Sequence, residues 1–303
     1  MGTNIISLSM KAILFNNDEF YFEKRDLLRK IFFICITTIK SIFMNTVIVP
    51  VDFSETSFNA ARYAVKLLTG HPEVEVILYH TFEKPEEEEN RVEGLEKLKE
   101  ELQDSREVNV SVLAEQGDFL EELEKLVRHR DADLVVMGIT GKSTLAQVFV
   151  GSNALKMAET KFCPVMIIPS NADYSEIKNV LLATDLKNVQ STTPSVPIKK
   201  VLSTFQPQLH IVNVNSEHYI QLTEDYRDEQ QKLREMFAEF NPEFYFLRLY
   251  DIDDAINQFA QDKSIDLIIT INKEHSRVHK LFFTGHTKKL AYQSTVPVMV
   301  VHE

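Results

Sequence analysis

The sequence contains only two cysteines, Cys35 and Cys163, which lie far apart and outside any metal-binding or redox spacing. This pattern suits a reducing compartment, so we expect a cytoplasmic protein. The sequence also lacks the run of roughly 20 apolar residues that a transmembrane helix needs, and the small-residue cleavage site of a signal peptide. We therefore expect neither a membrane span nor secretion.

Basic residues are in deficit, because 33 Lys and Arg stand against 45 Asp and Glu, which gives a net charge of −12. Nucleic acids and anionic membranes attract basic patches, so both are disfavoured as partners. A length of 303 residues accommodates about two domains. The content of 44% hydrophobic and 26% charged residues is ordinary for a soluble globular protein.

Residues 1–43 differ in composition from the rest of the chain. Several basic residues precede the apolar run Ile31–Ile36, and Lys40 interrupts the apolar residues that follow. We interpret this segment as a poorly ordered extension or an upstream mis-start, because Met44 begins directly on a strand. An interfacial amphipathic helix is the alternative.

Apolar segments alternate with amphipathic helical segments from residue 44 onward. Strands are expected at 46–51, 74–80, 108–113, 134–137 and 164–169, and helices between 54 and 70 and at 85–102, 119–127 and 153–158. Such alternation predicts an α/β fold with right-handed crossovers and a parallel sheet. Ligands of these sheets bind beyond the carboxyl ends of the strands, where Asp52 and Gly138 are expected.

The second half of the chain repeats the first at a constant offset. The segment 179–186 matches 46–53, Asp266 matches Asp133, and 296–301 matches 163–168. We therefore predict a 1–43 extension, a 44–170 domain, a 171–177 linker and a 178–303 domain. The apolar final strands of the two domains are expected to pair antiparallel, because each is an edge that needs covering.

A glycine motif follows the strand at 134–137: Gly138, Gly141 and Gly151-Ser152, separated by two and by nine residues. We expect the first two glycines to take positive φ and to let a ligand approach the main chain. The last glycine opens a helix whose free amides attract anions, so the motif predicts a phosphate cradle. An ordinary P-loop is excluded, because it needs a glycine at position 136, which is Val.

This glycine motif is complete and resembles the ATP-binding motif of the universal stress proteins. The resemblance implies two tandem, doubly wound, five-stranded Rossmann-like domains with strand order 3-2-1-4-5. It implies ATP as the ligand, with Mg²⁺ as a candidate companion ion. The nucleotide site implied for this chain comprises Pro50, Val51, Asp52, Thr81, Met137, Gly138, Gly141, Lys142, Gly151, Ser152 and Asn153.

The second half departs from this motif at the ligand. Ile271 and Glu274 stand at the positions of the two early glycines, and Gly285-His286 replaces Gly151-Ser152. We expect these side chains to obstruct the phosphates, so that the chain binds one ATP. His275, His279 and His286 lack a supporting array of ligands, so a metal site is not favoured.

No pair of residues with the roles of a base and a nucleophile accompanies the motif. The first loop, Asp52 to Thr56, also lacks the His-x-Gly-His and Ser-Gly-Gly motifs of adenylating enzymes. We expect ATP binding that adjusts conformation or association in the stress response, without turnover or with weak hydrolysis at most. A slow ATPase or phosphotransferase and a nucleotide-free interaction scaffold are the alternatives. The two domains are expected to form an intramolecular pseudo-dimer, with a further homodimer and unidentified protein partners left open.

Overall fold

The computed structural model describes residues 42–103, 106–139, 152–170, 172, 174, 176–214, 224–247, 252–273, 294 and 296–303. The chain separates into two compact units, residues 1–42 and 43–303. Apart from Ile42, every described residue lies in the second unit. Among these residues, no helix combines the length and the apolar character needed to cross a membrane.

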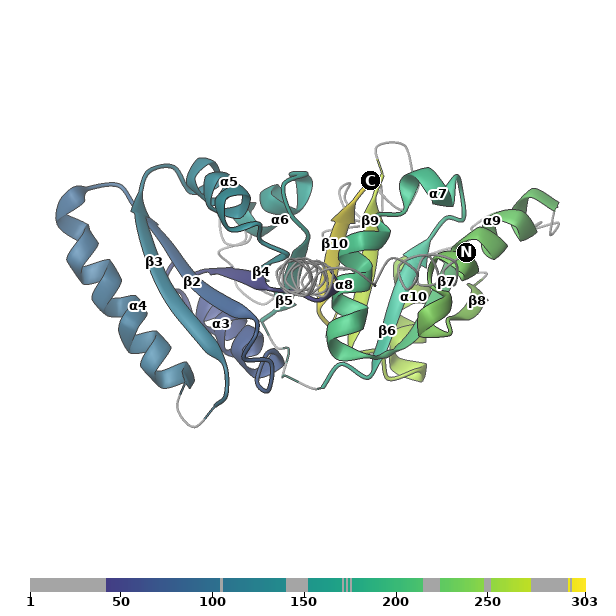
Figure 1. Cartoon of the computed structure of the whole chain (residues 1–303), viewed down its shortest axis with the longest axis horizontal. Helices are drawn as coiled ribbons and strands as arrows, with labels where there is room; N and C mark the ends of the chain where they lie inside the picture. Colours follow the sequence, from purple (N-terminus) through teal and green to yellow (C-terminus); the bar gives the residue numbers. More distant parts are fainter. Residues whose placement is uncertain are drawn as a thin grey trace, which may run out of the picture. The chain divides into compact units, whose positions relative to one another are not determined.

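The first half of unit 43–303 alternates strands and helices as predicted (Figure 1). Its elements are β1 (Thr46–Pro50), α3 (Glu55–Leu67), β2 (Glu75–Phe82), the 3-10 turn η1 (Pro85–Glu87), α4 (Glu88–Gln103), β3 (Asn109–Gln116), α5 (Phe119–Arg130), β4 (Leu134–Ile139), α6 (Ser152–Glu159) and β5 (Val165–Pro169). Side chains define where the helices begin. Ser54 caps α3 by accepting from Ser57 N, and Asp118 caps α5 by accepting from Leu120 N and Glu121 N.

The second half follows the same scheme with one interruption. Its elements are β6 (Asn179–Thr184), α7 (Val189–Thr192), α8 (Ser195–Phe205), β7 (Gln208–Val214), α9 (Glu224–Met236), the 3-10 turn η2 (Ala238–Phe240), β8 (Glu243–Leu247), α10 (Ile252–Asp262), β9 (Leu267–Asn272) and β10 (Val298–His302). In the first half a single helix, α3, follows the first strand. Here the short helix α7 and a break at Thr193-Pro194 precede α8.

The ten strands form one sheet in the order β3-β2-β1-β4-β5-β10-β9-β6-β7-β8. Each half therefore has the predicted order 3-2-1-4-5, and all pairings within a half are parallel. The first strand of each half lies between the second and the fourth. This is where the winding direction reverses and where such sheets bind ligands.

The two halves join through the antiparallel pairing of β5 with β10, as predicted (Figure 1). Met166 stands opposite Met299, its own equivalent in the repeat, while Val165 faces Val300 and Ile167 faces Val298. This register places a pseudo-two-fold axis between the two methionines. The edges that would otherwise be unpaired are covered within the chain.

Residues that alternate along the strands face two opposite layers of helices. Val47 and Val49 pack with α3 and α4 in a core cluster that continues across the second half to α8 and α9. On the other face, Ile48 packs with α5 and α6, and Leu181 packs with α10. Strands buried on both faces explain the near-continuous apolar runs of the sequence.

Candidate functional site

A cleft of about 250 Å³ lies at the carboxyl ends of β1, β2 and β4. It is lined by Pro50, Val51, Asp52, Ser54, Thr56, Ser57, Tyr79, His80, Thr81, Phe119, Met137, Gly138, Asn153 and Ala154. Seven of the predicted site residues therefore meet there: Pro50, Val51, Asp52, Thr81, Met137, Gly138 and Asn153. Strand ends and the first turn of α6 bring these distant segments of the sequence together.

Four predicted residues belong to the loop and helix start that follow β4. Gly141, Lys142 and Gly151 lie outside the described residues. Ser152 is the first residue of α6, an eight-residue helix whose first turn contains no acidic residue. The amide end of this helix therefore carries a favourable dipole for an anion.

Asp52 is held by a tight turn at the end of β1. Its Oδ1 accepts hydrogen bonds from Ser54 N at 3.0 Å and from Ser54 Oγ at 2.5 Å. Phe53, between them, has φ of 61°, an unusual conformation for a bulky residue. Burial alone raises the pKa of Asp52, but the hydrogen bonds from Ser54 and Ser57 lower it below its ordinary value. The side chain is thus an exposed, ionised acceptor at neutral pH.

Gly138 does not take the positive φ that we expected of it. Gly138 lies within β4, and the described glycines with positive φ are Gly70 and Gly117. A Cβ on Gly138 would lie 2.3 Å from Thr56 O and 2.7 Å from Thr56 Cγ2. Gly138 is therefore needed because the first turn of α3 lies directly against β4, and this contact shapes the wall of the cleft.

The sequence reasoning missed several residues that line the cleft, among them His80. The Nδ1 atom of His80 lies 2.6 Å from Val51 O, so it carries the proton and donates to this carbonyl. Burial lowers the pKa of His80, which keeps the ring neutral at pH 7. Beside it, Tyr79 OH donates to Glu115 Oε2 at 3.1 Å. The position of His80 near the carboxyl end of β2 was the available signal.

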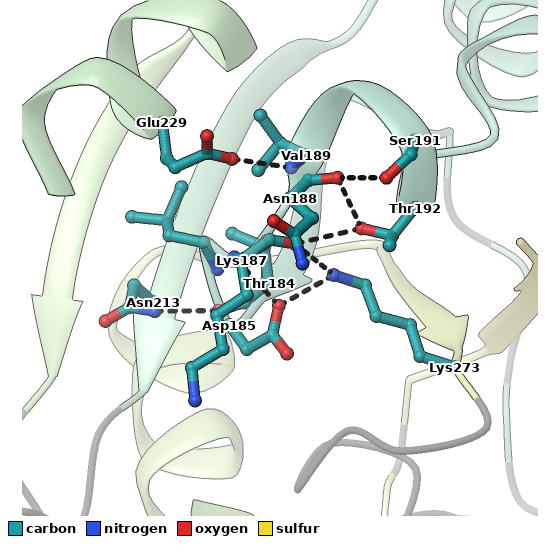
Figure 2. A network of polar contacts seen from close by, with 11 residues as sticks. Thr184, Asp185, Lys187, Asn188, Val189, Ser191, Thr192, Asn213, Glu229 and Lys273 are labelled. Carbon is teal, nitrogen blue, oxygen red and sulfur yellow. Dashed lines mark hydrogen bonds and ion pairs between the residues drawn. The ribbon is translucent and has the colours of Figure 1, made fainter. Parts of the chain in front are cut away.

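The second half reproduces the three-residue Asp52 turn at the equivalent positions. Asp185 Oδ1 accepts from Lys187 N at 3.2 Å, and Leu186 between them has φ of 51°. Asn213 Nδ2 donates to Thr184 O at 3.0 Å, as His80 donates to Val51 O in the first half. Figure 2 shows these contacts around Asp185. The turn is thus a repeated feature of the fold.

The two turns differ in what pairs with the carboxylate. In the second half, Lys273 Nζ lies 2.7 Å from Asp185 Oδ1 and 3.2 Å from Lys187 O (Figure 2). The side chains of Lys273 and Asp185 are only 7% and 14% exposed, so this ion pair is largely desolvated. The sequence reasoning did not single out Lys273, which looks like an ordinary lysine after a strand.

Ile271, which we expected to obstruct the phosphates, has its side chain in the core. It occupies the register position of Gly138, but its side chain is 2% exposed and packs into the core shared with α8. The interruption between α7 and α8 accompanies this side chain, whereas α3 approaches Gly138 without a break. Glu274, Gly285 and His286, which complete the predicted obstruction, lie outside the described residues.

The described residues contain no group of three or more His, Cys, Asp or Glu side chains able to hold a metal ion. His275, His279 and His286 lie outside the described residues. Of the described residues that line the cleft, Asp52 is the one with an acidic side chain.

Known proteins share both the sequence pattern and the fold. The model of the universal stress protein family matches residues 44–169 and 203–302, more than half of the chain. A universal stress protein of Methanocaldococcus jannaschii is 26% identical over 136 residues, which cover 40% of this chain and 80% of the relative.

Two solved structures resemble the whole tandem arrangement. A universal stress protein from Archaeoglobus fulgidus has a TM-score of 0.63 and 16% identity, over 86% of this chain and 97% of its own. A putative universal stress protein from Pseudomonas aeruginosa has a TM-score of 0.58 and 13% identity, over 86% and 94%. These likenesses concern the fold, and the family match extends over both halves. The chain belongs to the universal stress protein family.

Proposed function

We propose that the first half binds ATP in the cleft at the ends of β1, β2 and β4, and that bound ATP adjusts the conformation or association of the protein. The observation that carries this proposal is the convergence of seven predicted nucleotide-site residues on one cleft. Those residues come from β1, β2, β4 and α6, and a purely structural set of glycines and strand ends would not need to line a common cavity. The position at the reversal of winding supports the same conclusion.

Each part of the site has a role that its chemistry suits. The Asp52 carboxylate accepts hydrogen bonds from the ribose hydroxyls, because Ser54 keeps it ionised and oriented. Thr81 and Met137 border the base. The start of α6 and the glycines 141 and 151 receive the phosphates through main-chain amides, and Lys142 adds a positive charge. Mg²⁺ would be held mainly by the phosphates and by water, as this ion commonly is.

Binding rather than turnover is the proposed outcome, because the titratable groups of the lining are already engaged. The His80 Nδ1 proton is donated to Val51 O, and Asp52 is bound by Ser54 at the ribose end of the site. Hydrolysis would need a base for the attacking water near the last phosphate, and neither His80 nor Asp52 is proposed to lie there. We also propose that the protein works in the cytoplasm, which suits the buried free thiol of Cys163.

The test is to identify the small molecule that leaves the freshly purified, heat-denatured chain. Mass spectrometry should find an adenine nucleotide in an amount of about one per chain, and the intact protein should release phosphate no faster than a buffer control. Absence of any nucleotide, together with no thermal shift on adding ATP, would favour an interaction scaffold. Sustained phosphate release that depends on Asp52 would favour an ATPase.

A further inference from the structure

The three-residue turns at Asp52 and Asp185 share a hydrogen bond from a main-chain amide and a positive φ but differ in their charge balance. Both carboxylates accept the amide two residues later, and both are followed by a non-glycine residue with positive φ. The additional partner of Asp52 is the neutral hydroxyl of Ser54, whereas that of Asp185 is the ammonium of Lys273. The second half therefore retains the binding turn but supplies its own cation.

Lys273 reaches Asp185 from the end of β9. β9 covers Leu267–Asn272 and β4 covers Leu134–Ile139, which keeps the constant offset of the repeat, so Lys273 stands where the first half has Thr140. Its ammonium also donates to Lys187 O, the main-chain carbonyl of the same turn (Figure 2). Two of its three donors are thus directed into the turn, and 7% exposure leaves little of the side chain in water.

We propose that Lys273 closes the second half to nucleotides by acting as a built-in ligand of Asp185. This inference rests on the proposed role of Asp52 as the acceptor for ribose hydroxyls. An ammonium binds a desolvated carboxylate more strongly than a neutral hydroxyl does, because both partners of its hydrogen bond carry a charge. A ribose that displaced Lys273 would also leave a buried cation without its partner. Closure does not require Ile271, whose side chain is in the core.

The opposite interpretation is that Lys273 is a phosphate ligand of a second nucleotide site. The two interpretations predict opposite effects of removing the ammonium. If Lys273 closes the site, then its removal creates binding. If Lys273 binds phosphate, then its removal weakens a site that already exists.

The experiment titrates adenosine by calorimetry, because adenosine needs the ribose site but no phosphate cradle. In an Asp52→Ala chain, whose first-half site is weakened about 10- to 100-fold, we expect no measurable adenosine binding. Adding Lys273→Thr, which installs the residue type of position 140, should create one measurable site per chain, at least tenfold tighter than any residual adenosine binding of the Asp52→Ala chain. Lys273→Arg, which keeps the cation, should stay closed. A circular-dichroism melt establishes folding, and Lys273→Met provides a second opening variant should the Thr variant unfold.

Absence of adenosine binding in a folded Lys273→Thr or Lys273→Met variant would overturn the inference. ATP binding to the Asp52→Ala chain that is lost with Lys273→Met would also overturn it, in favour of a phosphate ligand. Failure of the proposed function looks different, because the wild-type first half would then bind no ATP while the Lys273 variants still report on the second half alone.

A second readout tests the buried pair without any nucleotide. Acylation of lysines in the full chain, followed by peptide mass spectrometry, should label Lys273 at least tenfold more slowly than Lys178, whose side chain is 69% exposed. Asp185→Asn should accelerate labelling of Lys273 and leave Lys178 unchanged. Equal labelling of the two lysines in the wild type would contradict the internal-ligand arrangement.

Discussion

Lys200 of α8 forms an ion pair with Asp133, the residue that precedes β4, and so links the two halves of the chain. The Asp133 carboxylate is 3% exposed and also accepts from Asn45 N at 2.6 Å and from Thr46 N at 3.2 Å. Lys200 is the one charged partner among these contacts. The pseudo-dimer is therefore held by a buried charge pair as well as by β5 and β10.

Replacing Lys200 with Met should destabilise the fold by about 3 kcal/mol, because it leaves the buried Asp133 carboxylate without a cation. The matched control is Lys178→Met, since the pair of Lys178 with Glu176 is 69% and 73% exposed. That change should cost less than about 1 kcal/mol. Urea denaturation of both variants measures the free energy of unfolding. An equally small decrease in both would show that the Lys200–Asp133 pair contributes little to stability.

Gly138 and Ile271 occupy the same register position and should respond to substitution for opposite reasons. Gly138→Ala places a Cβ against Thr56 O and should cost about 1–3 kcal/mol through overpacking. Ile271→Ala removes a side chain from the core and should cost about 2–5 kcal/mol through a cavity. Denaturant unfolding measures both. A neutral Gly138→Ala would mean that α3 does not lie directly against β4.

The stability of the protein should fall as the pH is lowered from about 6.5, because burial lowers the pKa of His80, His210 and His302. A histidine whose pKa is lower in the folded state binds more protons when unfolded. Its stabilising contribution is therefore complete above the unfolded pKa of about 6.5 and is lost at lower pH.

His80→Asn isolates one of these groups, because Asn213 makes the equivalent hydrogen bond in the second half. The variant should keep the donor to Val51 O and melt within a few degrees of the wild type at pH 7.5. Its melting temperature should fall less steeply between pH 7 and pH 5. If the melting temperatures of variant and wild type fell equally steeply with pH, then His80 would not contribute to the pH dependence.

Removal of residues 1–41 should leave the melting temperature and ATP binding unchanged. The sheet and the whole cleft lining belong to the compact unit 43–303, where Met44 is buried and its amide donates to Thr204 Oγ1 at 3.2 Å. Differential scanning calorimetry of the truncated and full chains provides the comparison. A drop of many degrees would reveal that the N-terminal segment stabilises the fold.

Much of the fold was predictable because its signals are local or repeated. The Ser54 cap, the apolar strands and the constant offset of the repeat predicted the elements, the two halves and the β5–β10 pairing. The position of Asp52 at a strand end predicted its place in the cleft. These features depend on neighbouring residues or on the winding rule for parallel sheets.

The missed features depend on contacts between segments that are distant in sequence. The sequence motif includes Gly138, but glycine is required there because Thr56 lies against it. No local pattern places the helix of Thr56 against β4. Lys273 was overlooked because its burial comes from Asp185, and a lysine after a strand usually faces solvent. The residue types were visible in the sequence, but their partners were not.

Calorimetric titration of ATP into the wild type, Asp52→Ala and Asp185→Ala chains tests the central claim, which is one nucleotide bound by the first half. We expect one ATP per wild-type chain. Loss of the charged acceptor in Asp52→Ala removes about 1.5–3 kcal/mol and weakens binding about 10- to 100-fold. Asp185→Ala, the matched change in the second half, should leave the affinity and stoichiometry as they are. Two equal sites in the wild type, or unchanged binding in Asp52→Ala, would contradict the account.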